Sequence, residues 1–343
     1  MVSISRKYFG AICFLLCAST AAPQILRSEE TQLSTTSPKA CWPSRELAAK
    51  VGEGDVKKTT AEPLLPESAE ANSDPADISP RSPSATGTVR SVRLPPGKKL
   101  IALTFDLCEG PHEIAGYQGE IVDILRANEV RATFFVSGKW MLTHRLRAQQ
   151  LISDARFEIG NHTWAHRNLR LLTGSAAKDE IESTERAYEQ IRQDVEDRKC
   201  IAPGHDKIAD ETAPKSMSVF RFPFGACDPK SLSEVSTAGL VPIQWDVSSD
   251  DPDFKQTPEL IKRKVLENVR PGSIVLFHAN GRGWYTDDAL ADIISALTAR
   301  GFEFVTVSEL LKAGEPIISS SCYDRSVGDT DRYDDLARRL EEE

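Results

Sequence analysis

The feature that most constrains the fold is a repeated alternation of short β-type runs and amphipathic helical stretches between residues 99 and 313. The predicted strands, rich in β-branched and aromatic residues, lie at 100–105, 131–136, 157–160, 220–224, 241–246, 273–278 and 302–307. Helical patterns follow at 118–128, 140–153, 176–195, 231–238, 258–268 and 287–300, with a last one from residue 308. Repeated βα units predict an α/β fold with a parallel sheet, and they favour a closed or nearly closed barrel over a doubly wound open sheet.

The N-terminus has the pattern of a secretory signal. Arg6 and Lys7 precede an apolar run from Tyr8 to Cys17, and small residues follow up to position 22. The pattern predicts that residues 1–22 are a signal peptide and that the protein is exported, periplasmic or extracellular, without stable membrane insertion. A retained N-terminal anchor is the alternative, although the apolar run is short for a membrane span.

Two further segments differ in composition from the βα region. Residues 23–98 hold ten of the twenty prolines and many Ser, Thr and Glu residues, so we expect a mostly disordered spacer with at most a short helix at 44–51. Residues 314–343 end in a run dense in Asp, Arg and Glu, which predicts a solvated or frayed tail.

Charge and cysteine content narrow the function classes. The 42 basic and 51 acidic residues give a formal net charge of -9, which argues against nucleic acid or anionic membranes as partners. Five of the seven cysteines follow the predicted signal peptide, and in an exported protein this odd number predicts one or two disulfides and at least one unpaired thiol. No Cys-x-x-Cys spacing supports a thiolate zinc site.

Polar residues gather at the ends of the predicted strands. In a βα barrel these ends converge on one face, where catalytic groups lie, so their coincidence predicts an active site although each residue alone suits a structural role. The residues are Asp106, His162, His166, Arg221, Asp246 and His278.

The sequence from His162 to His166 places two imidazoles four residues apart. On a helical turn this spacing puts both rings on one face, where two neutral nitrogens can bind one metal ion. A capping and packing pair is the alternative reading. A carboxylate from another strand end would complete a hydrolytic metal site with open positions.

In five motifs the chain resembles the polysaccharide deacetylase family, the NodB homology domain of carbohydrate esterase family 4. They are Thr104-Phe-Asp106, His162-Thr-Trp-Ala-His166, Arg221-Phe-Pro-Phe-Gly225, Gln244-Trp-Asp246 and Leu276-Phe-His278, in this order. The resemblance implies a distorted (β/α)7 barrel over residues 99–313. It also implies an enzyme that uses a divalent metal ion, with zinc favoured, to remove N-acetyl groups from N-acetylglucosamine-containing glycans such as chitooligosaccharide, peptidoglycan or exopolysaccharide.

The resemblance also implies roles for the motif residues. Asp106 would be the general base, Arg221 the partner that keeps it ionised, and His278 the general acid with Asp246 as its orienting carboxylate. His162 and His166 would bind the metal. Such an assignment suits amide hydrolysis, which needs an activated water, a cation near the carbonyl oxygen and an acid for the departing amine.

One departure from the family pattern affects the metal site. The family usually has a second aspartate directly after the base, as the third metal ligand, and here Leu107 stands in its place. We expect Glu109 to replace it, while Cys108, Asp106 itself and weak or absent metal binding remain open. Because Cys227 follows the Arg221 motif, the family's geometry also suggests a disulfide between Cys108 and Cys227.

Three functions follow from these patterns. The first is a metal-dependent glycan deacetylase. The second is a glycan-binding pseudoenzyme that lost turnover when Leu107 replaced the metal-binding aspartate. The third is a hydrolase of other amides on the same barrel, because a fold does not fix its substrate. Retention of Asp106, Arg221, Asp246 and His278 favours an enzyme, since binding alone needs neither acid nor base.

Overall fold

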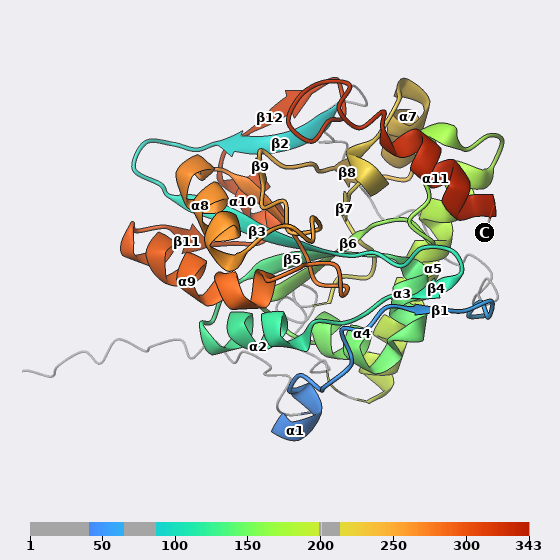
Figure 1. The fold of residues 1–343 in the computed structure, drawn as a ribbon, viewed down its shortest axis with the longest axis horizontal. Coiled ribbons are helices and arrows are strands. Elements are labelled where there is room, and N and C mark those ends of the chain that lie inside the picture. Colours follow the sequence, from blue (N-terminus) through green and yellow to red (C-terminus); the bar gives the residue numbers. More distant parts are fainter. Residues whose placement is uncertain (1–40, 65–86, 199, 201–212, 343) are drawn as a thin grey trace, which may run out of the picture. The chain divides into compact units, whose positions relative to one another are not determined.

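A curled, half-barrel sheet of eight strands forms the centre of the computed structural model, which describes residues 41–64, 87–198, 200 and 213–342 (Figure 1). The strand order is β8-β7-β6-β5-β3-β10-β9, with β11 paired to β3, and every pairing in this sheet is parallel. The strands are β3 (Leu100–Leu107), β5 (Ala132–Val136), β6 (Phe157–Asn161), β7 (Val219–Phe220), β8 (Val241–Pro242), β9 (Val247–Ser248), β10 (Ile274–His278) and β11 (Glu303–Phe304). The predicted parallel α/β sheet is therefore confirmed.

The helices follow the predicted alternation. The helical stretch predicted at 140–153 is divided at His144 into α3 and α4, while 258–268 is a helix over the whole predicted range. The helices of the βα region are α2 (Gly119–Ala127), α3 (Gly138–Thr143), α4 (Arg145–Ile152), α5 (Ala176–Asp197), α7 (Pro229–Thr237), α8 (Pro258–Asn268), α9 (Thr286–Ala299) and α10 (Val307–Ala313), with short 3-10 turns at Leu169–Leu171 and Pro223–Gly225. Among the helices of the described residues, none combines the length and apolar character that crossing a bilayer requires.

Strand alternation divides the apolar residues between two cores. In β3, Leu103 and Phe105 belong to the large core that includes buried residues of the helices, whereas Ala102 belongs to a smaller core on the other face. In β10, Phe277 and Leu276 divide in the same way. The polar residues that end these strands continue the second face, and this places them together at one end of the sheet.

The described part of the predicted spacer is ordered, which corrects the expectation for residues 41–64 and 87–98. Helix α1 (Ser44–Leu47) confirms the short helix, β1 (Lys57–Lys58) pairs with β4 (Glu113–Ile114), and a disulfide joins Cys41 to Cys200. β2 (Thr88–Arg93) contributes Val89 to the smaller core. Residues 1–40 and 65–86, including the predicted signal peptide, lie outside the described residues.

The C-terminal region also differs from the predicted frayed tail. β12 (Glu315–Ser319) pairs antiparallel with β2, and α11 (Tyr333–Glu342) follows a loop that carries Cys322. A disulfide joins Cys322 to Cys227, directly after the Arg221 motif. Composition predicted disorder at both ends of the chain, but disulfides and strand pairing fix the described parts against the βα region.

Candidate active site

Asp106 and Arg221 form a buried ion pair at the end of the sheet. Asp106 is the penultimate residue of β3, and Arg221 directly follows β7. An Nη1 hydrogen of Arg221 is donated to Oδ1 of Asp106 over 2.7 Å, and both side chains are buried. The guanidinium lies 4.0 Å from the ring centre of Phe135. Burial lowers the pKa of Arg221, against the opposing charge of Asp106. The structure thus brings the predicted base and its cationic partner together.

His278 is held by Asp251. Its Nδ1 lies 2.8 Å from Oδ1 of Asp251, while Oδ2 of the same carboxylate accepts hydrogen bonds from the His278 N–H and the Thr286 hydroxyl. Burial lowers the pKa of His278, but the charge and the hydrogen bond of Asp251 outweigh it, so the pKa is raised. This arrangement favours the imidazolium form and leaves Nε2 as the nitrogen that can exchange a proton.

Asp251 replaces Asp246 in the predicted role of orienting carboxylate. Asp246 accepts hydrogen bonds from the N–H of Ile274 and the hydroxyl of Ser273, at the opposite end of β10 from His278. It also pairs with Arg270. The prediction was wrong because a second short strand, β9, follows Asp246 and carries the chain on to the end of the sheet where Asp251 lies.

His162, His166 and Cys108 form a cluster of metal-ligating atoms. One atom from each side chain lies within 4.8 Å of the others, and Sγ of Cys108 is 3.4 Å from Nε2 of His162. The His162 Nδ1–H is donated to the carbonyl oxygen of Arg221 over 2.8 Å, so Nε2 keeps its lone pair toward the cluster. Burial lowers the pKa of both histidines, which favours the neutral form that binds metals.

The two histidines approach each other on a loop, which corrects the predicted helical turn. Residues 162–166 follow β6 without helical structure, and Thr163 and His166 have positive φ angles of 64° and 51°. The imidazole centroids are 4.9 Å apart. Non-glycine residues with positive φ are uncommon and gather at functional sites, where surrounding contacts hold them.

Glu109, the expected third metal ligand, lies apart from this cluster. Its carboxylate accepts hydrogen bonds from the N–H of Ala115 and the hydroxyl of Thr143, and burial raises its pKa to about 7. Leu107 is fully buried in the large core. Successive side chains of an extended strand point to opposite faces, so Cys108 rather than Leu107 or Glu109 follows Asp106 into the site.

The predicted Cys108–Cys227 disulfide is wrong. Cys227 pairs with Cys322, and Cys108 is a buried free thiol. Burial, with a further contribution from the charge of Asp106, raises the pKa of Cys108 well above its usual value. The sequence could not predict the pairing, because Cys322 reaches Cys227 only after the chain has passed through β12.

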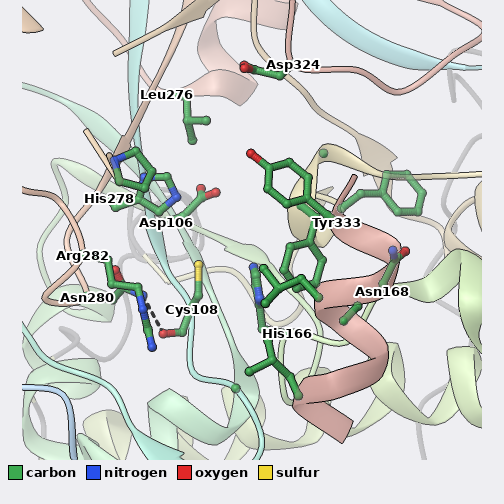
Figure 2. A pocket seen from close by; sticks show the side chains of 18 of the residues that line it. Asp106, Cys108, His166, Asn168, Leu276, His278, Asn280, Arg282, Asp324 and Tyr333 are labelled. Carbon is green, nitrogen blue, oxygen red and sulfur yellow. Dashed lines mark hydrogen bonds between the residues drawn. The ribbon is translucent and has the colours of Figure 1, made fainter. Parts of the chain in front are cut away.

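A cavity of about 640 Å³ joins these groups, and its size is that of a pocket for a small molecule or part of a larger one. Figure 2 shows Asp106 and His278 on one side, with His166 and Tyr333 across from them and Cys108 between. The cavity wall therefore carries a carboxylate held by an arginine, an imidazole held by a carboxylate, and the imidazole of His166 with the thiol of Cys108, while His162 is buried beside them. Together these groups can take up a proton, deliver one and bind a cation.

Comparisons with known proteins agree with this chemistry. The family model described as polysaccharide deacetylase matches residues 93–243. A peptidoglycan-N-acetylglucosamine deacetylase of Bacillus cereus is 31% identical over 221 residues, which are 64% of this chain and 91% of the relative. A chitooligosaccharide deacetylase of Azorhizobium caulinodans is 30% identical over 225 residues, which are 62% of this chain and 95% of that relative.

Solved structures share the fold. A peptidoglycan N-acetylglucosamine deacetylase is similar with a TM-score of 0.52 and 26% identity, over 66% of this chain and 93% of that one. A mutant of a family 4 carbohydrate esterase pseudoenzyme with restored enzymatic activity has a TM-score of 0.52 and 25% identity, over 67% of this chain and 73% of that one.

Proposed function

Because the chain belongs to the polysaccharide deacetylase family, we propose that it is a metal-dependent hydrolase that removes N-acetyl groups from N-acetylglucosamine-containing glycans. The main support for this proposal is that two proton-transfer groups, each held by a different partner, line the same cavity. Asp106 is paired with a buried arginine, and His278 is paired with the carboxylate of Asp251. Chitooligosaccharide, peptidoglycan and exopolysaccharide are the substrate classes to compare.

Asp106 is the proton acceptor in this proposal. Arg221 lies 2.7 Å from Oδ1 of this carboxylate, and the second oxygen, Oδ2, lies 3.6 Å from Nε2 of His162. A carboxylate in this position takes the proton of a water molecule that attacks the acetyl carbonyl. Oδ1 stays occupied by the guanidinium, so Oδ2 is the oxygen that receives the proton.

His278 is the proton donor. Asp251 holds Nδ1, and therefore the proton on Nε2 is the one that can be delivered to the departing amine nitrogen. The raised pKa of His278 favours retention of that proton. The Thr286 hydroxyl and the His278 N–H, both donated to Asp251, fix the carboxylate and hence the ring.

A set of donor atoms beside Asp106 and His278 fits a metal ion. His162, His166 and Cys108 would hold it, with two neutral nitrogens and a thiol that must release its proton on binding. Nitrogen and sulfur donors suit zinc, the metal that we propose for this site. When bound, the ion would polarise the acetyl carbonyl oxygen, where negative charge develops during hydrolysis.

Export is part of the same proposal. The signal-like pattern at the N-terminus supports it, and so do two disulfides among the described residues, because such bonds persist in oxidising compartments. No contact with nucleic acid is expected from the acidic net charge.

Acetate release by the purified protein tests the function. We expect release from at least one N-acetylated glycan, loss of release on chelation and recovery with added zinc. Asp106→Asn should abolish turnover. A wild-type protein that binds these glycans and releases no acetate with any divalent metal would contradict the proposal, and it would establish the pseudoenzyme reading based on Leu107.

A further inference from the structure

The C-terminal segment from Tyr323 to Leu340, here called the C-terminal strap, crosses the rim of the catalytic cavity. Arg325 pairs with Asp250 after β9, and the Trp245 Nε1–H is donated to Asp324 over 3.0 Å. Further along the strap, the ring of Tyr333 contacts the ring of Phe224, which lies in the loop after β7. The strap therefore lies against the ends of several adjacent strands on one side of the cavity.

The strap is also anchored at the start of α11. Arg170, in the turn after the metal-binding loop, pairs with both Asp331 and Asp334, and the Asn168 side-chain amide is donated to Asp334 over 3.0 Å. The disulfide between Cys227 and Cys322 fixes its beginning. Asp329 accepts hydrogen bonds from three successive backbone N–H groups, which shapes the loop between these anchors.

Helix α11 turns an apolar stripe toward the catalytic groups. Tyr333, Leu336, Ala337 and Leu340, spaced at three and four residues, line the same cavity as Asp106 and His278. Leu336 and Leu340 remain 36% and 37% exposed, so they face the cavity rather than a packed core. Figure 2 shows Tyr333 and α11 across the cavity from His278.

When the reacting sugar is an internal unit of a polymer, the polymer chain must extend from the active site in both directions. Here the strap closes the side next to the ends of β6, β7, β8 and β9, and the cavity of about 640 Å³ suits a short ligand. The remaining rim is formed by the loops after β3 and β10, where Arg282 pairs with Glu113. A glycan can therefore extend past one side of the reacting sugar.

We infer that the C-terminal strap makes the enzyme selective for N-acetyl groups at the end of a glycan or in short oligosaccharides, over those in the interior of a polymer. This inference rests on the proposed deacetylase function. Leu336 and Leu340 supply the apolar surface against which the terminal sugar packs, and Tyr333 limits how far the chain extends. Substrate length is thus set by a segment outside the βα region.

The test compares N-acetylated chitopentaose with a soluble chitin polymer. Mass spectrometric sequencing locates the deacetylated sugar, and we expect the wild-type protein to modify a terminal sugar at least tenfold faster than internal ones. A chain ending at Arg332, which lacks α11, should raise the ratio of internal to terminal deacetylation, and the ratio of polymer to disaccharide activity, at least tenfold.

A second pair of variants, both of full length, tests the inference even if the shortened chain misfolds. Arg170→Gln removes the anchor of α11 and should shift deacetylation toward internal sugars, whereas Arg338→Gln, an exposed arginine that pairs with Asp335 on the same helix, should not. Equal rates at internal and terminal sugars in the wild type would overturn the inference alone. So would an unchanged position of deacetylation in the folded variants. Absence of acetate release from every glycan would overturn the proposed function and this inference with it.

Discussion

The two ends of the catalytic cavity hold histidines in opposite electrostatic settings. At one end, burial lowers the pKa of His278, but Asp251 outweighs burial and raises it. At the other end, burial lowers the pKa of His162 and His166, and the nearby charge of Asp106 does not outweigh it for His162. In the proposed mechanism the same residue type thus serves as a proton donor at His278 and as a metal ligand at His162 and His166, according to whether a carboxylate is hydrogen-bonded to the ring.

The largest effect should come from removing a lone-pair donor. His162→Ala or His166→Ala should weaken zinc binding by more than about 100-fold, since loss of a direct ligand exceeds the loss known for residues behind a ligand. Acetate release should fall with it. His278→Asn should reduce turnover by about 10²–10⁴-fold and leave the metal bound, because this residue moves a proton.

Metal content after dialysis and the rate of acetate release separate the two ends of the cavity. If His278→Asn lost the metal while His166→Ala retained it, the roles assigned here would be reversed.

A smaller effect should follow from changing Asp251, the carboxylate that is hydrogen-bonded to His278. Asp251→Asn should lower the pKa of His278, because burial then acts without the opposing charge. The imidazolium would lose its proton at lower pH, so the alkaline limb of the pH–rate profile should shift to lower pH. Turnover should fall by about 100-fold. Asp246→Asn is the matched control, since that carboxylate lies at the other end of β10.

Profiles of kcat/KM against pH would show the difference between the two variants. A shift in Asp246→Asn with none in Asp251→Asn would restore the role that the sequence predicted for Asp246.

The next prediction concerns Cys108 as the third metal ligand. Replacing sulfur by the weaker oxygen donor in Cys108→Ser should reduce zinc affinity by about 10–100-fold, less than loss of an imidazole. The cobalt-loaded wild type should show sulfur-to-metal charge-transfer absorption that the variant lacks. Ser248→Ala, another residue that lines the cavity, is the control. Equal cobalt spectra in the wild type and Cys108→Ser would exclude the thiolate as a ligand.

The sequence predicted the sheet well because its physical basis is local. Buried parallel strands need apolar runs of matching length, and β3, β5, β6 and β10 each lie within two residues of the predicted bounds. The predicted grouping of Asp106, His162, His166, Arg221 and His278 followed from the same logic, since parallel strands end at one edge.

The residues that sequence reasoning misplaced depend on tertiary structure. Asp251 lies on a loop after a two-residue strand that periodicity cannot detect, and its only signal was an acidic pair before Pro252. Cys108, which the sequence left open as a third ligand, could have been preferred to Glu109 from strand alternation, because it follows Asp106 by two residues. The ordered parts of both ends of the chain depend on disulfides and ion pairs between distant residues, which composition does not reveal.

The smallest effect concerns a buried acid behind the metal end. Glu185 of α5 accepts hydrogen bonds from the Asn161 amide over 2.9 Å and from the Met217 N–H, and Asn161 precedes His162. Burial raises the pKa of Glu185 from 4.5 to about 7. Between these values the folded protein keeps a proton that the unfolded chain has lost, so this residue makes the protein less stable as pH rises from 4.5 to 7.

Glu185→Gln removes this charge and keeps one acceptor oxygen for one of the two hydrogen bonds. The free energy of unfolding at pH 8 should therefore rise by about 1–3 kcal/mol, and at pH 4.5 it should change little. Urea unfolding at the two pH values measures the difference, and Glu182→Gln, which removes an exposed carboxylate on the same helix, should change stability by less than about 0.5 kcal/mol at both. Equal stability of Glu185→Gln and the wild type at pH 8 would mean that Glu185 ionises as easily when folded as when unfolded. The burial that favours neutral His162 would then not extend behind β6, because a carboxylate there would be as well solvated as in water.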